Sequence, residues 1–178
     1  RHLDFTADTT LNRRLTPQEF YGKNNAPAIV VNCTFFSFAT HKNLSTVIRE
    51  GKTVGWDVYS RKKGDSLNYI HSFGSAIGIS RRRKADIAWV YADRVKKRAL
   101  ALQYPVNAFS DSDSFYIPGK NTVNILDSGA TRWKVRTAVG GGPVLLQEGE
   151  IKITNNEELK FAGKAIHDKH PRTGIGYT

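Results

Sequence analysis

Short apolar segments joined by glycine-containing turns are the feature that most limits how this chain can fold. Two such pairs occur, at residues 43–60 and 140–153, and a Glu-Gly dipeptide stands inside each, at Glu50-Gly51 and at Glu148-Gly149. Glycine adopts the positive φ that a tight two-residue turn requires. Each pair of segments therefore predicts a β-hairpin.

Further strands are predicted in the middle of the chain. Residues 75–80 and 85–92 are rich in apolar and β-branched side chains, and the cationic run Arg81–Lys84 between them predicts an exposed turn. Residues 94–106 and 132–139 fit either a strand or a helix, because periodicity does not separate the two in a short apolar run.

Helices are predicted at only two places. Thr16-Pro17-Gln18-Glu19 is a capping box with proline at the first helical position, which predicts a short helix ending near Gly22. The stretch from Thr154 to Glu157 repeats the Thr-x-x-Glu spacing and predicts a second short helix that ends at about Phe161.

Two apolar segments lie toward the ends of the chain. Residues 26–31, APAIVV, predict a fully buried strand, and residues 173–178, TGIGYT, predict a strand. Residues 110–114, SDSDS, predict a loop. Many strands with few, short helices indicate an α+β fold, strand-rich, with a large mixed or antiparallel sheet. We expect an irregular lead-in with a short helix over residues 1–25 and one domain over residues 26–178.

The charge balance favours an anionic partner. The chain of 178 residues has 27 Lys and Arg against 16 Asp and Glu, a net charge of +11. Such a balance attracts polyanions and phosphates, although a solvated cationic surface is equally compatible with it. The chain has no recognised nucleic-acid motif, so no nucleic-acid partner is expected. No apolar run approaches the ~20 residues of a membrane-spanning helix. The histidines have no metal-ligand spacing, and we expect neither a metal nor another cofactor.

Three stretches contain groups suited to a binding site. The first is Gly140-Gly141-Gly142-Pro143, where bare backbone amides could approach an anion or a sugar. It matches neither the Walker pattern nor the dinucleotide fingerprint. A close crossing of two backbones within a sheet would also require these glycines.

The second stretch is His170-Pro171-Arg172-Thr173. Arg172 offers a two-pronged donor for phosphate, and His170 can transfer a proton near neutral pH. An ordinary charged surface loop is the alternative.

The third stretch is Asn32-Cys33-Thr34-Phe35-Phe36, directly after the predicted strand at 26–31. Polar side chains at the end of a buried strand often line a site. A strand end with aromatic core residues is the alternative, yet Phe35 and Phe36 cannot both face a core if the strand is regular. Cys33 is the single cysteine, so no internal disulfide can form, and a small buried side chain is a simpler role for it than a nucleophile.

Taken in order, VNCTFF, AVGGGPVLLQEGE and HPRTGIGY resemble the phosphodiester glycosidase family over roughly residues 26 to 178. The resemblance implies hydrolysis of a glycosyl phosphodiester of the N-acetylglucosamine type. The substrate would then be a phosphorylated glycan or sugar phosphodiester, and the protein would be secreted, periplasmic or on the cell surface. A module that binds an anionic polysaccharide without turnover is the alternative.

The resemblance also suggests roles for individual residues. Arg172 would clamp the phosphate, His170 would protonate or hydrogen-bond the leaving oxygen, and Asn32 would bind a sugar hydroxyl or the acetamido group. The remaining candidates for substrate contact are Gly140, Gly141, Gly142, Thr173 and Phe36. The family continues into an Asp-Gly-Gly-Gly-Ser segment that this sequence does not contain, so we expect an incomplete domain and a catalytic carboxylate outside these stretches.

Overall fold

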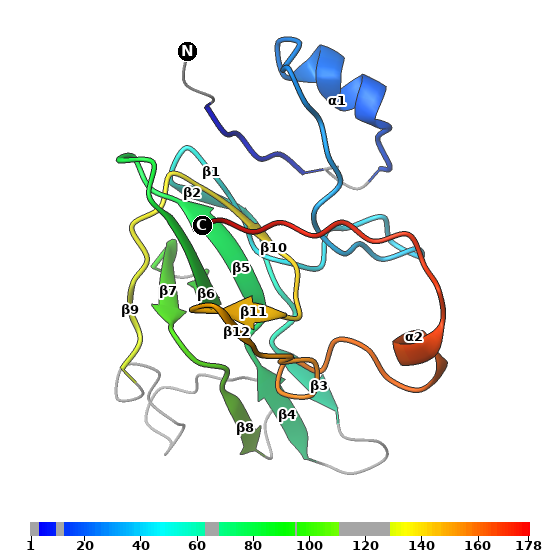
Figure 1. Ribbon diagram of the computed structural model, residues 1–178, viewed down its shortest axis with the longest axis vertical. Coiled ribbons are helices and arrows are strands. Elements are labelled where there is room, and N and C mark those ends of the chain that lie inside the picture. Colours follow the sequence, from blue (N-terminus) through cyan, green and yellow to red (C-terminus); the bar gives the residue numbers. More distant parts are fainter. Residues whose placement is uncertain (1–3, 10–12, 63–67, 95, 111–128) are drawn as a thin grey trace.

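The computed structural model describes residues 4–9, 13–62, 68–94, 96–110 and 129–178, and its largest element is a seven-stranded antiparallel sheet (Figure 1). The order in this sheet is β2-β1-β10-β5-β6-β7-β9. Its strands are β1 (Val47–Arg49), β2 (Lys52–Gly55), β5 (Ser75–Ile79), β6 (Ala85–Asp93), β7 (Arg98–Leu102), β9 (Thr131–Arg132) and β10 (Thr137–Gly140). The predicted strand-rich α+β class is confirmed.

Two smaller sheets complete the strand content of the described residues. One is three-stranded, in the order β3-β4-β8. Its members are β3 (Ser60–Lys62), β4 (Tyr69–Ser72) and β8 (Asn107–Ser110). The other is the hairpin of β11 (Leu146–Gln147) and β12 (Glu150–Ile151). The sequence did not predict the three-stranded sheet, because its strands are only three or four residues long and together mix polar with apolar side chains.

The two predicted hairpin turns are confirmed. Glu50 and Gly51 have φ of 52° and 78°, and Glu148 and Gly149 have φ of 53° and 82°. Positive φ at both central residues gives the turn the twist of the strands that it joins. The first turn joins β1 to β2, and the second joins β11 to β12.

Alternation of side chains along β6 fills two apolar layers, one on each face of the large sheet. Trp89 packs with Phe73 and Leu102 on one face, whereas Val90 packs with Ala76 and Ala138 on the other. Burial on both faces explains why β7 and β10, which begin within the undecided stretches 94–106 and 132–139, are strands. The predicted turn at Arg81–Lys84 is also confirmed, and a Ser80 N–H to Lys84 C=O hydrogen bond of 2.9 Å closes it.

The first predicted helix is confirmed as α1 (Pro17–Lys23), with both hydrogen bonds of the Thr16–Glu19 capping box in place. The second predicted helix is wrong. Residues 155–159 form a hydrogen-bonded turn instead, and Leu159, with φ of 52°, leaves the helical region. A different short helix, α2 (Lys164–His167), follows this turn.

Both strand predictions near the chain ends are wrong. Residues 26–31 have no ladder partner, and Ile29 is 73% exposed. Positive φ at Asn25 and Ala26 turns the chain here, and β1 is already paired on both sides, with β2 and β10. Residues 173–178 are likewise unpaired and exposed; Figure 1 shows this C-terminal segment running across the molecule as an irregular trace.

The irregular lead-in contacts the large sheet. Asp8 forms ion pairs with Lys23 of α1 at 2.7 Å and with Arg49 of β1 at 3.5 Å, and Ala7 beside it is buried. The division at residues 25 and 26 stays a prediction. The predicted loop at 110–114 lies, apart from Ser110, outside the described residues.

Two neighbouring glycines allow a test of how tightly this sheet is packed. A Cβ on Gly140 would lie 2.8 Å from the backbone nitrogen of Thr46, whereas a Cβ on Gly141 would meet only the Cys33 carbonyl, at 3.7 Å. We predict that Gly140→Ala lowers the free energy of unfolding by about 1–3 kcal/mol through overpacking. Gly141→Ala should change it by less than about 0.5 kcal/mol, as measured by urea denaturation. Equal losses in the two variants would contradict this account.

Candidate functional site

The centre of the candidate site is the carboxylate of Glu158, which is only 1% exposed. Its Oε2 accepts hydrogen bonds from the backbone N–H and the hydroxyl of Ser75, both at 2.9 Å. Its Oε1 accepts from the Thr154 hydroxyl at 2.6 Å and from the Val144 N–H at 3.2 Å. These four donors take up the lone pairs of both oxygens. Glu158 is thus suited to fixing its neighbours in place rather than to transferring a proton.

Gly142 lies against this carboxylate. A Cβ at Gly142 would lie 2.8 Å from the Ser75 hydroxyl and 3.1 Å from Cε of Lys160, and it would overlap the Glu158 carboxylate. Gly142 also has φ of 94°, a conformation that side chains rarely adopt. Glycine is therefore required here by both space and backbone geometry.

Asp57 is a second buried carboxyl beside the first. It is 7% exposed, and its Oδ1 accepts a hydrogen bond of 2.7 Å from the Val58 N–H. Burial raises the pKa of Asp57 above its usual value, and the charge of Lys160 opposes that rise in part. Lys160 lies near both carboxyls. Its Nζ is 2.9 Å from the position of a Cβ on Gly74, which the Asp57 carboxyl also adjoins, and its Cε is 3.1 Å from the position of a Cβ on Gly142, which the Glu158 carboxylate adjoins.

An aromatic pair adjoins Lys160. The ammonium lies 5.6 Å from the ring centroid of Phe35, and the Phe35 and Phe161 rings pack in a T-shaped arrangement with their centroids 5.8 Å apart. Asn155 holds Phe161 in position, since its side-chain amide bonds both the N–H and the C=O of Phe161 at 2.9 Å. The Arg172 guanidinium stacks over Phe161 at 4.2 Å and donates to the Ala165 carbonyl at 3.1 Å.

These contacts connect all three sequence stretches. Phe35 belongs to the first stretch, Gly142 to the second and Arg172 to the third, and Lys160 with Phe161 joins them. The Cys33 carbonyl also lies next to Gly141. Segments that are far apart in sequence thus meet around one cation.

Several predicted residues lie farther from this centre or are otherwise engaged. The amides of Gly140 and Gly141 donate to the Thr46 and Ser75 carbonyls, at 2.6 and 3.0 Å, so these two N–H groups are already used within the protein. Phe36 packs on Phe38 at 4.9 Å, and the Arg14 guanidinium lies over both rings. The side chains of Asn32, His170 and Thr173 belong to exposed residues. Their proposed roles stay predictions.

Sequence reasoning missed Asp57, Glu158 and Lys160. Asp57 follows β2 within a tryptophan-containing apolar run, which was a weak signal for a buried carboxyl. Glu158 was missed because the capping-box pattern predicted that Glu157 would be the partner of Thr154. In the structure the Thr154 hydroxyl donates to the Glu158 carboxylate instead. Within the described residues, no group of three His, Cys, Asp or Glu side chains could hold a metal ion. None of the helices in that part of the chain has the length and apolar character needed to cross a membrane.

An antiparallel α+β domain with two buried carboxyls, a cation near both and an adjoining aromatic pair has groups suited to a sugar with an anionic substituent. The family model described as phosphodiester glycosidase matches residues 24–178, and the chain therefore belongs to the phosphodiester glycosidase family. No curated protein and no solved structure shows a significant match to the chain.

The saturated hydrogen bonding of Glu158 predicts a sharp response to substitution. Glu158→Gln places an amide NH₂ against groups that are already donors, leaving buried donors unsatisfied. We expect a loss of about 1–3 kcal/mol in the free energy of unfolding. Glu157→Gln is the matched control, because Glu157 is exposed, and it should cost less than about 0.5 kcal/mol. Equal effects of the two substitutions, in urea denaturation, would show that the carboxylate has no special role.

The raised pKa of Asp57 predicts a pH-dependent stability. An acid with a higher pKa in the folded state holds its proton more firmly there, so its contribution to stability falls as pH rises from the unfolded-state pKa through the folded-state pKa. Asp57→Asn removes this loss, and the variant should gain stability relative to the wild type between pH 4 and pH 7. Denaturation at both pH values measures the difference, with exposed Asp168→Asn as control. A relative stability that falls over that interval would contradict the burial account.

Proposed function

We propose that this chain hydrolyses a glycosyl phosphodiester at the bond between the anomeric carbon and the bridging phosphate oxygen. The observation that carries the proposal is the position of Lys160, which lies beside buried Asp57, against Gly142 and over Phe35. Membership of the phosphodiester glycosidase family supports the reaction class. The substrate class that we favour is a phosphorylated glycan or sugar phosphodiester of the N-acetylglucosamine type.

Cations at the site match the charge that develops in this reaction. A phosphodiester has one negative charge, and cleavage of the sugar C–O bond leaves a phosphate monoester with further charge on its oxygens. A fixed ammonium directed at that oxygen stabilises the transition state more than the ground state. We assign this role to Lys160, with Arg172 as the outer clamp, because its planar guanidinium can bind two phosphate oxygens at once.

A buried carboxyl supplies the proton acceptor. In the proposed reaction a water oxygen bonds to the anomeric carbon, the bond to the bridging oxygen breaks, and the phosphate monoester leaves with the electron pair. The water proton passes to Asp57, whose raised pKa makes it a stronger base than an exposed aspartate. Phosphate is a good leaving group, so assistance from a general acid matters less than in ordinary glycosides. The role of His170 would then be to donate a hydrogen bond to the leaving phosphate oxygen.

The sugar itself would bind at the rim of the site. Asn32 precedes Cys33, whose carbonyl lies at Gly141, and its side chain can bond a sugar hydroxyl or an acetamido group. Phe36 and Thr173 are the outer contacts in this proposal. Because substrates with such chemistry occur on glycans outside the cytoplasm, we further propose a secreted, periplasmic or cell-surface location.

Hydrolysis in water labelled with ¹⁸O tests the reaction. N-acetylglucosamine 1-phosphate esterified to methanol or to nitrophenol is a suitable substrate. The proposal predicts free sugar with ¹⁸O at its anomeric carbon and an unlabelled phosphate monoester, as resolved by mass spectrometry. Label in the phosphate would indicate attack at phosphorus and would overturn the proposal. Binding of the diester without turnover would favour the non-catalytic polysaccharide-binding module.

The role of Lys160 predicts a specific kinetic defect. Lys160→Gln should lower kcat/KM by about 10²–10³-fold, the cost of losing one group that stabilises developing negative charge. Lys164→Gln removes an equal charge from exposed α2 and should leave kcat/KM within about twofold. Near-normal turnover by the Lys160 variant, with the fold checked by circular dichroism, would remove Lys160 from the mechanism.

A further inference from the structure

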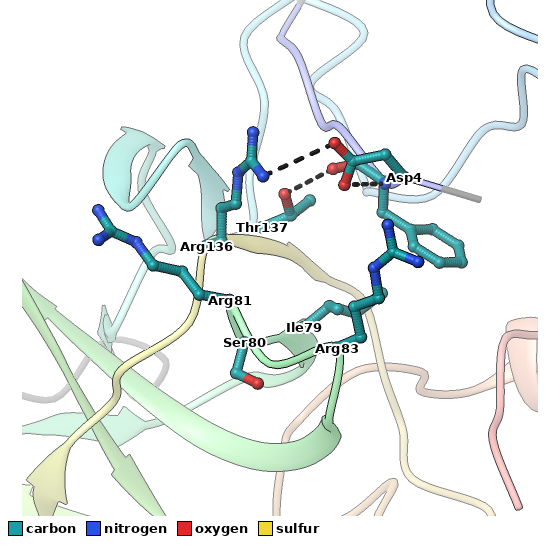
Figure 2. Close-up of a pocket in the computed structure, with 8 residues that line it drawn as sticks. Asp4, Ile79, Ser80, Arg81, Arg83, Arg136 and Thr137 are labelled. Atoms are coloured by element: carbon teal, nitrogen blue, oxygen red, sulfur yellow. Dashed lines mark hydrogen bonds and ion pairs between the residues drawn. The ribbon is translucent and has the colours of Figure 1, made fainter. Parts of the chain in front are cut away.

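A hollow lies where β5 ends and β10 begins (Figure 2). The turn that follows β5 forms one side of it, with Arg81 and Arg83, and the start of β10 forms another, with Arg136 and Thr137. The lead-in segment Asp4–Phe5 lies across it, anchored by a 2.8 Å hydrogen bond from the Thr137 hydroxyl to the Phe5 carbonyl.

The hollow and the Glu158 centre occupy opposite ends of the same two strands. Thr137 pairs with Ile79 at the hollow, and Gly140 pairs with Ala76 next to Ser75 at the other end. Four residues along a strand separate Ser75 from Ile79, which corresponds to roughly 13 Å. One phosphate group cannot contact both places, so the hollow is a separate feature.

The turn that positions Arg83 is closely defined. Arg83 N–H donates to the Ser80 carbonyl at 2.9 Å, and Lys84 N–H donates to the Ser80 hydroxyl at 3.1 Å. Arg83 itself has φ of 60°, the left-handed region in which glycine or asparagine is usual. Glycine would accept this backbone conformation with less strain, so the turn itself does not require an arginine at this position.

The positive charge of this hollow is poorly balanced. Arg136 pairs with Asp4 at 3.7 Å, and both side chains are about half exposed or more, at 48% and 67%. A long, exposed ion pair of this kind contributes little and exchanges readily. Among the described residues, neither Arg81 nor Arg83 has an acidic partner. In Figure 2, Arg83 rises on the side of the turn where Asp4 lies, whereas Arg81 extends away on the other side.

We propose that this hollow binds a tetrahedral oxyanion, a phosphate or sulfate group, between Arg83 and Arg136. Guanidinium groups bind two oxygens of such an anion in parallel. The anion would displace the Asp4 carboxylate from Arg136. It would also give Arg83 an anionic partner, which this side chain does not have within the described part of the chain. The group could be free in solution or could be the terminal group of a phosphorylated or sulfated glycan. The proposal does not depend on the proposed hydrolysis.

Arg83→Gly provides a test with little risk of unfolding. Glycine accepts the left-handed backbone, so the turn should be kept while the guanidinium is lost. Inorganic phosphate and glucose 6-phosphate are titrated into ¹⁵N-labelled protein, and the amide signals of residues 80–84 and 136–137 report binding in the hollow. Amides of residues 74–75 and 142 report binding at the Glu158 centre separately.

We expect Arg83→Gly and Arg136→Gln each to raise Kd at the hollow by at least tenfold. Asp4→Asn should lower Kd severalfold, because the competing carboxylate is removed. Arg132→Gln, on exposed β9, is the control with equal charge loss and should leave Kd within twofold. Tighter binding of glucose 6-phosphate than of phosphate would identify a glycan-borne group, and equal binding would identify the free anion; both support the site. Unchanged Kd in Arg83→Gly and Arg136→Gln, or an equal loss in Arg132→Gln, would overturn it.

Discussion

The buried carboxylate of Glu158 is the constraint on which the arrangement of the site depends. An ionised carboxylate is costly to bury unless hydrogen bonds replace its hydration. Here the replacement comes from the start of β5 at Ser75, from Val144 after the glycine run, and from Thr154. The hydrogen bonds to this single carboxylate therefore hold three separate segments together. The turn that carries Glu158 also fixes the place of Lys160.

The two buried carboxyls differ in what their surroundings allow. Glu158 has donors for all of its lone pairs, so it holds structure. Asp57 is buried with fewer donors, and burial raises its pKa, so the balance between its protonated and ionised forms is available for chemistry. Lys160 lies next to both. In our proposal the carboxyl with a full set of hydrogen-bond donors, Glu158, has the structural role. The carboxyl with fewer donors, Asp57, has the catalytic role.

Local features of the fold were predictable, and long-range ones were not. The turn at Glu50-Gly51 and the helix after Thr16 follow from residues adjacent in the chain, and both are confirmed. The apolar run at 26–31 was predicted to be a buried strand. Composition alone does not show whether the sheet has an unpaired edge strand with which this segment could form hydrogen bonds. The family resemblance drew attention to the three stretches, which Lys160 and Phe161 together connect. It could not identify Glu158, since the Ser75 partner lies 83 residues away.

The central claim is that the three stretches form one ligand site around Lys160, and amide chemical shifts test it most directly. The ¹⁵N-labelled protein is titrated with N-acetylglucosamine 1-phosphate, which has the sugar and the phosphate of the proposed substrate. Our account predicts concerted, saturable shifts at Phe35, Gly142, Lys160, Phe161 and Arg172, with a common Kd. A titration in which these five amides stay unshifted, or in which the glycine and Phe161 amides respond with different affinities, would contradict it.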